Sequence, residues 1–193
     1  MRKKETLDSE YFDALYASDP DPWKFASSAY EKDKYEKTLA ALPEPRYGSG
    51  LEIGCSIGVL TRELAQRCDA LVAVDAAGAP LSEAMRRCVA FPQVRFEQMT
   101  TPGQWPSGAF DLILLSEVVY YLSAKDVVSL AGRVAKSLAP RADVVLVHWT
   151  GDTDYPLTGD EAADLFIACM SSTLIVNRHD RYPKFRLDVL RRR

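Results

Sequence analysis

The stretch from Leu51 to Thr61 constrains the fold of this chain more than any other, because an apolar strand breaks there into a glycine-bearing turn. Gly54 and Gly58 remove side chains where the backbone must bend sharply and where a ligand must lie close to it. Glu52 adds a carboxylate beside backbone N–H groups that face the same crevice. The stretch therefore predicts a site for a molecule with an amine and a carboxylate, although a simple strand-to-helix turn also fits it.

The same turn departs from the fingerprint of dinucleotide-binding folds. G-x-G-x-x-G would require glycine at three positions, which hold Gly54, Ser56 and Val59. A pyrophosphate needs a bare backbone at the second position and a closely packed helix at the third. NAD and FAD are therefore disfavoured, and a nicotinamide oxidoreductase is the weaker alternative.

A second polar position follows the next buried strand. The apolar run from Ala70 to Val74 ends in Asp75, about 20 residues after the glycine turn, where a carboxylate can accept both hydroxyls of a ribose. An ordinary helix-initiating aspartate is the alternative. The next helix is expected to start later, at Ala79 and Pro80, which favours the ribose role.

Strands and helices alternate five times along the chain, which predicts an α/β fold with a doubly wound parallel sheet. A turn is expected over residues 139–142, and a closing hairpin of two further strands places one antiparallel strand in the sheet. The sheet is thus expected to be Rossmann-like, mostly parallel and seven-stranded. The later strands are expected at Val94–Glu97, Phe110–Leu115, Asp143–Val147, Leu174–Val176 and Phe185–Leu190.

Two aromatic-rich helices, at Ser9–Ala17 and Ser28–Leu42, are expected before the first strand. They predict a helical cap over residues 1–46 that covers the ligand crevice of a core at residues 47–193, in one compact unit. An arm that packs on the sheet only for stability fits most of these side chains equally well.

Composition narrows the class of protein. At 193 residues and 47% hydrophobic content the chain can build one well-buried domain. A net charge of −3 provides no large basic field, so nucleic acid is not an expected partner. Four cysteines without a C-x-x-C pair predict reduced thiols, no metal site and a cytoplasmic protein. Neither a signal peptide nor a membrane span is expected, and the expected state is a monomer or weak homodimer.

Five segments of the chain carry a family resemblance: Asp21-Pro22-Trp23, Tyr30-Glu31, Leu51-Glu52-Ile53-Gly54-Cys55, Phe110-Asp111-Leu112-Ile113 and Glu117-Val118-Val119-Tyr120-Tyr121-Leu122. Together they resemble the class I S-adenosylmethionine-dependent methyltransferases over nearly the whole chain, and the NodS family in particular. NodS proteins N-methylate the deacetylated glucosamine end of a chitooligosaccharide. The resemblance implies S-adenosyl-L-methionine as cofactor and S-adenosyl-L-homocysteine as product.

The resemblance also implies where the cofactor lies. Its methionine part is expected near the glycine turn, its ribose on Asp75 and its adenine between Ala76 and the Thr100 loop, with Lys34 meeting the carboxylate. The adenine-binding aspartate of many methyltransferases is replaced here by Met99 and Thr100. The full expected cofactor set is Trp23, Tyr30, Lys34, Glu52, Gly54, Cys55, Ser56, Gly58, Asp75, Ala76, Thr100, Ser116 and Glu117.

An amine acceptor must lose its proton before it attacks the methyl group, so a base near the working pH is expected. His148, at the end of the fifth strand, is the first candidate; a histidine that merely hydrogen-bonds a loop is the alternative. Glu117 could bind the acceptor amine or line the adenine pocket, and the resemblance favours the second role. The expected substrate contacts are Tyr120, Tyr121, Trp149 and Tyr155.

The function predicted from the sequence is methyl transfer to a small molecule, preferably to an amine such as a deacetylated amino sugar. O-methylation of a small hydroxyl or carboxyl compound remains an alternative. A non-catalytic scaffold that only binds the cofactor is another.

Overall fold

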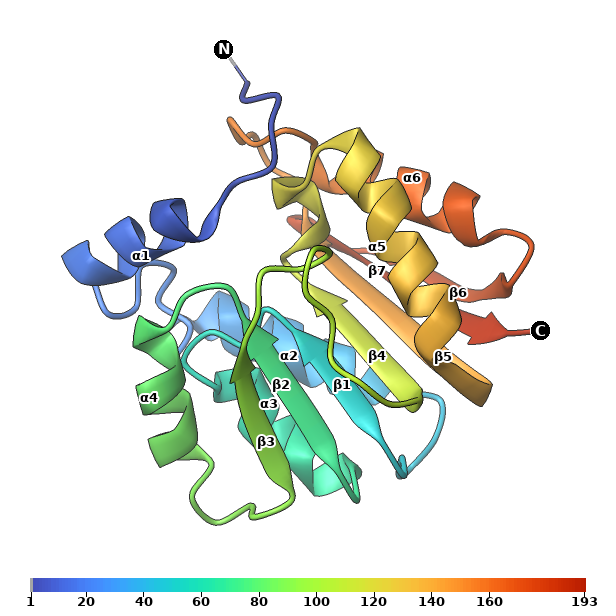
Figure 1. The fold of residues 1–193 in the computed structure, drawn as a ribbon, viewed down its shortest axis with the longest axis horizontal. Coiled ribbons are helices and arrows are strands. Elements are labelled where there is room, and N and C mark those ends of the chain that lie inside the picture. The colour runs from blue at the N-terminus through green and yellow to red at the C-terminus, as the bar shows by residue number, and fades with distance from the viewer. Residues whose placement is uncertain (1) are drawn as a thin grey trace.

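The computed structural model describes residues 2–193, and Met1 lies outside them. A seven-stranded sheet with the order β3-β2-β1-β4-β5-β7-β6 runs through the molecule, with helices on both faces (Figure 1). Its strands are β1 Gly50–Ile53, β2 Leu71–Asp75, β3 Val94–Gln98, β4 Phe110–Ser116, β5 Leu138–Trp149, β6 Leu174–Arg181 and β7 Phe185–Arg192. The α-helices are α1 Ser9–Ser18, α2 Ala29–Ala41, α3 Val59–Leu64, α4 Ala79–Arg87, α5 Ala124–Ser137 and α6 Gly159–Met170, and short 3₁₀ turns are η1 Ala65–Arg67 and η2 Val119–Tyr121.

The central strands are buried on both faces, which explains their uninterrupted apolar sequences. Successive side chains of a strand point to opposite faces, so each strand supplies two cores. On one face Leu51 and Ile113 pack in a cluster with Phe166 of α6. On the other face Leu114 packs in a cluster with Leu64 of α3. In Figure 1, α5 and α6 lie in front of the sheet, and α2 and α3 lie behind it.

The strand order reverses direction at β1, which lies between β2 and β4. Glu52 pairs with Ala73 on one side and with Leu114 on the other, so these three strands end at the same edge. Open parallel sheets bind ligands in the crevice outside the carboxyl ends of their strands, where the order reverses. The predicted α/β class and the mostly parallel sheet are confirmed.

The turn expected over residues 139–142 is wrong. Strand β5 already begins at Leu138, which pairs with Phe110, and pairing resumes at Asp143 after a register shift. The intervening residues form a bulge inside the strand, where Arg141 has a φ of 61°. Because Leu138 and Ala142 are both buried, the segment stays packed against the core and does not leave the sheet.

The predicted closing hairpin is confirmed, with a shorter loop than expected. Strand β7 is antiparallel to β5, with Val189 opposite Val145, and β6 pairs with the other edge of β7. Both helices expected before the first strand are present as α1 and α2. That they form a separate cap at residues 1–46 over a core at 47–193 stays a prediction. Within residues 2–193, the structure contains no helix with the length and apolar character that a membrane crossing requires.

Gly58 is the N-cap residue of α3, has a φ of 75° and leaves no room for a side chain. A Cβ atom built there would lie 2.8 Å from the Cα atom of Ala84 on α4.

We expect Gly58→Ala to lower the free energy of unfolding by about 2 to 3 kcal/mol, because it combines a left-handed backbone with overpacking. Urea denaturation measures this. The matched control is Gly132→Ala within α5, where nothing lies within 4 Å; it is expected to stabilise by about 0.5 to 1 kcal/mol, and equal losses in both variants would contradict the prediction.

Candidate active site

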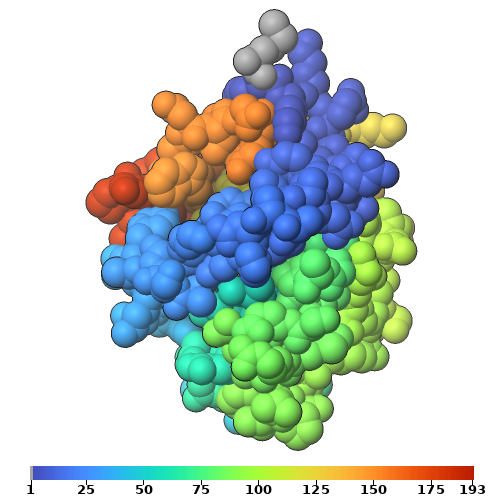
Figure 2. All heavy atoms as spheres, turned by 90° about the vertical axis from the view of Figure 1, so that its left-hand side faces the viewer, coloured from blue at the N-terminus to red at the C-terminus, as the bar shows by residue number. Residues whose placement is uncertain are grey.

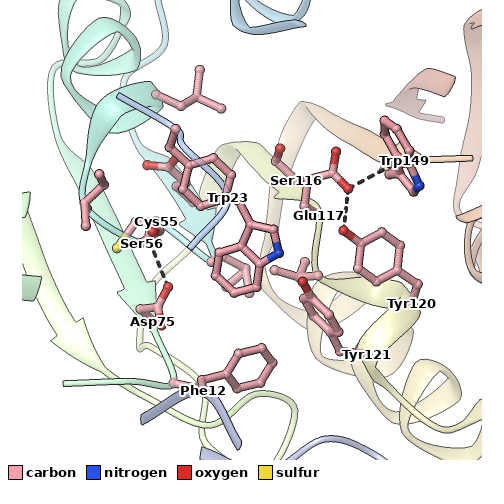
Figure 3. Close-up of a pocket in the computed structure, with 18 of the residues that line it drawn as sticks. Phe12, Trp23, Cys55, Ser56, Asp75, Ser116, Glu117, Tyr120, Tyr121 and Trp149 are labelled. Atoms are coloured by element: carbon pink, nitrogen blue, oxygen red, sulfur yellow. Dashed lines mark hydrogen bonds between the residues drawn. The ribbon is translucent and has the colours of Figure 1, made fainter. Parts of the chain in front are cut away.

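A cavity of about 430 Å³ opens at the carboxyl ends of β1, β2 and β4. Figure 2 shows α1 and the segment after it, in blue, lying across this side of the molecule between α4, in green, and the loop after β5, in orange. The cavity wall combines the glycine turn and the end of β2 with residues 99–101, most of residues 116–122, and residues 149, 152, 153 and 155. In the view of Figure 3, Asp75 and Ser56 lie on one side of the cavity and Glu117 and Trp149 on the other, with Trp23 between them.

The glycine turn follows β1 directly. Gly54 has a φ of 83°, and a Cβ atom there would lie 2.2 Å from the Cγ1 atom of Val118 in the loop after β4. Only glycine fits this position. Its backbone N–H donates to the carbonyl of Val74 at 2.8 Å, so the turn is tied to the neighbouring strand.

Glu52 brings a carboxylate to the wall of the cavity. Its side chain is 2% exposed, and Oε2 has no hydrogen-bond partner. Burial raises the pKa of Glu52 to about 7. A buried carboxylate oxygen without a partner is costly unless a ligand supplies the missing donor. The ammonium group of an amino acid moiety is such a donor, so the residues present fit a cofactor of this kind.

Asp75 ends β2 on the opposite side of the glycine turn. Oδ2 accepts a hydrogen bond from the backbone N–H of Ser56 at 2.8 Å, and Oδ1 accepts one from Ala77 at 2.9 Å. Burial raises the pKa of this carboxyl to about 6. Each carboxylate oxygen can accept a further hydrogen bond, so the group is fixed in place and still able to hold two hydroxyls.

Glu117 joins four segments of the chain at the other end of the cavity. One carboxylate oxygen contacts Nζ of Lys34 at 2.6 Å, and the other accepts from the Tyr120 hydroxyl at 2.5 Å and the Trp149 backbone N–H at 2.9 Å. Lys34 is 2% exposed and also pairs with Glu31 at 2.9 Å. Burial alone would raise the pKa of Glu117, but the ammonium of Lys34 helps to bring it below its usual range.

The expected contact of Lys34 with the carboxylate of the cofactor therefore stays a prediction. Lys34 lines the cavity, but its Nζ lies between the carboxylates of Glu31 and Glu117. The sequence could not indicate this pairing, because Glu117 lies far along the chain and takes an unusual backbone φ of 58° to reach Lys34.

The expectation that His148 faces the crevice is wrong. His148 is fully buried, does not line the cavity, and accepts a hydrogen bond at Nε2 from the Val119 backbone at 3.3 Å. Burial lowers its pKa to about 4. Side chains alternate along a strand, so the next residue, Trp149, reaches the cavity instead. His148 thus has the place of a histidine that hydrogen-bonds a loop.

Gly58 also does not line the cavity, because its backbone packs against α4. The structure brings the remaining predicted residues together around one space, although their contacts with a ligand stay predictions. Those lining residues are Trp23, Tyr30, Lys34, Glu52, Gly54, Cys55, Ser56, Asp75, Ala76, Thr100, Ser116, Glu117, Tyr120, Tyr121, Trp149 and Tyr155.

Sequence reasoning assigned no individual site role to several lining residues. Phe12 and Tyr16 of α1 line the cavity, as do Phe25 and Glu31. The helical spacing of the aromatic residues indicated an apolar face on the first helix, but spacing does not reveal what a face covers. Among residues 2–193, no group of His, Cys, Asp and Glu side chains is arranged to hold a metal ion.

Several solved structures that share this fold are methyltransferases. A putative methyltransferase from Pseudomonas syringae is 33% identical, with a TM-score of 0.72, and the alignment covers 86% of this chain and 100% of that one. N-methyltransferase NodS from Bradyrhizobium japonicum WM9, solved with S-adenosyl-l-homocysteine, has a TM-score of 0.80 at 20% identity, covering 96% and 99%. The chain therefore has the Rossmann-like fold of the class I methyltransferases.

Sequence comparison identifies the family. The model of Nodulation protein S (NodS) matches residues 12–147. Nodulation protein S from Bradyrhizobium diazoefficiens is 31% identical over 111 residues, which are 57% of this chain and 52% of that protein. The protein of the same name from Sinorhizobium fredii is 28% identical over 160 residues, 80% of this chain and 73% of that protein. The chain belongs to the NodS family, as its motifs predicted, and it spans about half the length of the first of these relatives.

Proposed function

We propose that this protein is an S-adenosylmethionine-dependent methyltransferase that acts on a small-molecule acceptor. The single observation that carries the proposal is the unpartnered, buried Oε2 atom of Glu52 beside the glycine turn. Glu52 would hold the ammonium of the cofactor, Asp75 its ribose hydroxyls, and the segments at Ala76 and Thr100 its adenine. Membership of the NodS family supports this assignment, as does the S-adenosyl-l-homocysteine complex of Bradyrhizobium NodS.

When bound, the cofactor supplies a methyl group that is already activated by the sulfonium. The protein must then align the acceptor and exclude water, and positioning of this kind can lower a barrier by roughly 7 to 11 kcal/mol. The aromatic side chains that line the cavity suit this task. Tyr120 stacks on Tyr155 with ring centroids 5.3 Å apart, and Tyr30 meets Trp149 edge-on at 5.6 Å.

The charge of the cavity favours an amine acceptor, such as that of a deacetylated amino sugar, over an anionic carboxyl compound. Among the residues that line the cavity, Lys34 is the one basic side chain, against five acidic ones. Complementary charge at a binding site favours the matching ligand and suppresses the opposite one. The lining acids are Glu31, Glu52, Asp75, Glu117 and Asp152.

Calorimetry with S-adenosyl-L-homocysteine tests the cofactor, and a panel of acceptors tests the reaction. We expect micromolar binding of the product and transfer of one methyl group from S-adenosyl-L-methionine to amines, detected by mass spectrometry. Absence of binding at high micromolar concentration would refute the proposal. Binding without turnover on amines, hydroxyls or carboxylates would favour the scaffold, and turnover confined to hydroxyl or carboxyl compounds would favour O-methylation.

The affinity for the cofactor is expected to rise with pH. At pH 6 most of Glu52 is protonated in the free protein, because its pKa is about 7, and a neutral carboxyl does not pair with an ammonium. S-adenosyl-L-methionine should therefore bind up to about tenfold more weakly for each pH unit below that pKa. Calorimetry between pH 5.5 and 8 measures the trend. In Glu52→Gln, any change of affinity with pH that remains should occur near pH 6, because the pKa of Asp75 is about 6. A wild-type affinity that is constant between pH 5.5 and 8 would contradict the assignment.

We also propose that the protein is a cytoplasmic monomer or weak homodimer without a nucleic-acid partner. In this proposal, residues 1–46 form a cap over a core at residues 47–193. Four arginines in the last two strands support the absence of a nucleic-acid site, because acidic groups pair with them. Arg178 pairs with Asp180, Arg181 with Asp160, Arg186 with Asp188 and Arg191 with Asp143. Size-exclusion chromatography with light scattering tests the oligomeric state.

A further inference from the structure

Ser56, in the glycine turn, has a backbone conformation that its side chain disfavours. Its φ is 48°, in the left-handed region where a Cβ atom crowds the following carbonyl. Glycine would adopt this conformation freely. Non-glycine residues in such conformations cluster at functional sites, so the contacts of the Ser56 side chain are informative.

The hydroxyl of Ser56 reaches α1. Its Oγ atom lies 2.5 Å from the hydroxyl of Tyr16, and both side chains are buried. Tyr16 also meets the edge of Trp23, with ring centroids 5.8 Å apart, and lies in an apolar cluster with Ile57 and Ala77. Burial raises the pKa of Tyr16 well above its usual range, so the phenol stays neutral and keeps its hydrogen bond. A glycine at position 56 could not make this bond.

The backbone of Ser56 contacts the other functional group of this region. Its N–H donates to Oδ2 of Asp75 at 2.8 Å, and Oδ1 of the same carboxylate accepts from Ala77. Ser56 therefore touches α1 through its side chain and the expected ribose-binding carboxylate through its main chain. Figure 3 shows the second of these bonds as a dashed line.

We propose that Ser56 is a positioning residue that couples the docking of α1 to occupancy of the cofactor site, through its hydroxyl contact with Tyr16. This inference rests on the proposed function. A ligand that fixes Asp75 also fixes the backbone N–H of Ser56, and through the side chain it fixes Tyr16 and α1. Coupling between two sites is reciprocal, so the docking of α1 through Tyr16 must raise the affinity for the cofactor by the same factor by which the cofactor favours docked α1.

Removal of either hydroxyl tests the coupling. We expect Ser56→Ala and Tyr16→Phe each to weaken binding of S-adenosyl-L-homocysteine by about 5- to 10-fold, mainly through faster dissociation. The double variant should be no weaker than either single variant, because the two hydroxyls form one contact. Native-state hydrogen exchange over residues 9–18 should accelerate in the variants, and the ligand should protect these amides less than in the wild type.

Ser56→Gly separates positioning from stability. Glycine relieves the backbone strain, so its melting temperature should exceed that of Ser56→Ala, yet the two variants should bind S-adenosyl-L-homocysteine equally weakly. Ser18→Ala is the control on α1, because it removes a hydroxyl that bonds only to the Leu15 carbonyl and should leave the affinity unchanged.

Two results would overturn the inference: variants that bind S-adenosyl-L-homocysteine as the wild type does, whatever their melting temperatures, or fully additive losses in the double variant. A wild type that binds no S-adenosyl-L-homocysteine would instead count against the proposed function. The two failures are thus distinguishable.

Discussion

Lys34→Met is expected to lower the free energy of unfolding by about 3 to 5 kcal/mol, because it removes one partner of a buried ion pair. The ammonium of Lys34 lies 2.6 Å from Glu117 and 2.9 Å from Glu31, and its side chain is almost fully buried. Without it, both carboxylates remain in a poorly solvated place, and their pKa values rise. Urea denaturation at pH 8 measures the loss.

The pH dependence of this loss has a definite sign. In Lys34→Met, lowering the pH protonates the two stranded carboxylates, so the deficit relative to the wild type should shrink between pH 8 and pH 5. The control is Lys37→Met on the same helix, whose ion pair with Asp33 is largely exposed and should cost less than about 1 kcal/mol. A Lys34→Met variant no less stable than Lys37→Met would show that the pair does not hold α2 to the end of β4.

Asp75→Ala is expected to weaken binding of S-adenosyl-L-homocysteine by about 100-fold or more. The substitution removes the acceptor for the ribose hydroxyls and also releases the backbone N–H groups of Ser56 and Ala77. A loss of this size corresponds to about 3 kcal/mol, which two or three hydrogen bonds to a charged group supply. Titration calorimetry measures it directly.

Asp111→Ala provides a matched control for Asp75→Ala. Asp111 also accepts two backbone N–H groups, those of Gly48 and Ser49, but it does not line the cavity. Both variants should lose stability, and only Asp75→Ala should lose the ligand. Equal affinity in the two variants would refute the ribose role of Asp75.

The features that could be predicted from the sequence are those that depend on local pattern. The apolar runs of β1, β2 and β4 predicted strands buried on both faces, and the carboxyl ends of such strands meet at one edge. Glu52, Gly54 and Asp75 stand at those ends, so their convergence followed from the topology alone.

The features that escaped prediction depend on side-chain direction and on distant partners. Whether His148 or Trp149 faces the crevice depends on the phase of β5, and one residue reverses the answer. The bulge that starts β5 early could not be distinguished from a turn in an Ala-Pro-Arg-Ala sequence. The pairing of Lys34 with Glu117 joins residues that are 83 positions apart, and no local pattern encodes it.

The position of β7 in the sheet has a consequence for how the chain is made. β7 is the last strand in the sequence, yet it lies between β5 and β6 and pairs with β5 along seven residues. While the ribosome is still adding residues 185–192, the outer edge of β5 therefore has unpaired backbone groups, and apolar side chains such as Val145 and Val147 lack part of their cover. Nascent chains with such an open edge are prone to aggregate. Chains that stall before residue 185 should consequently depend on chaperones far more than the finished protein does.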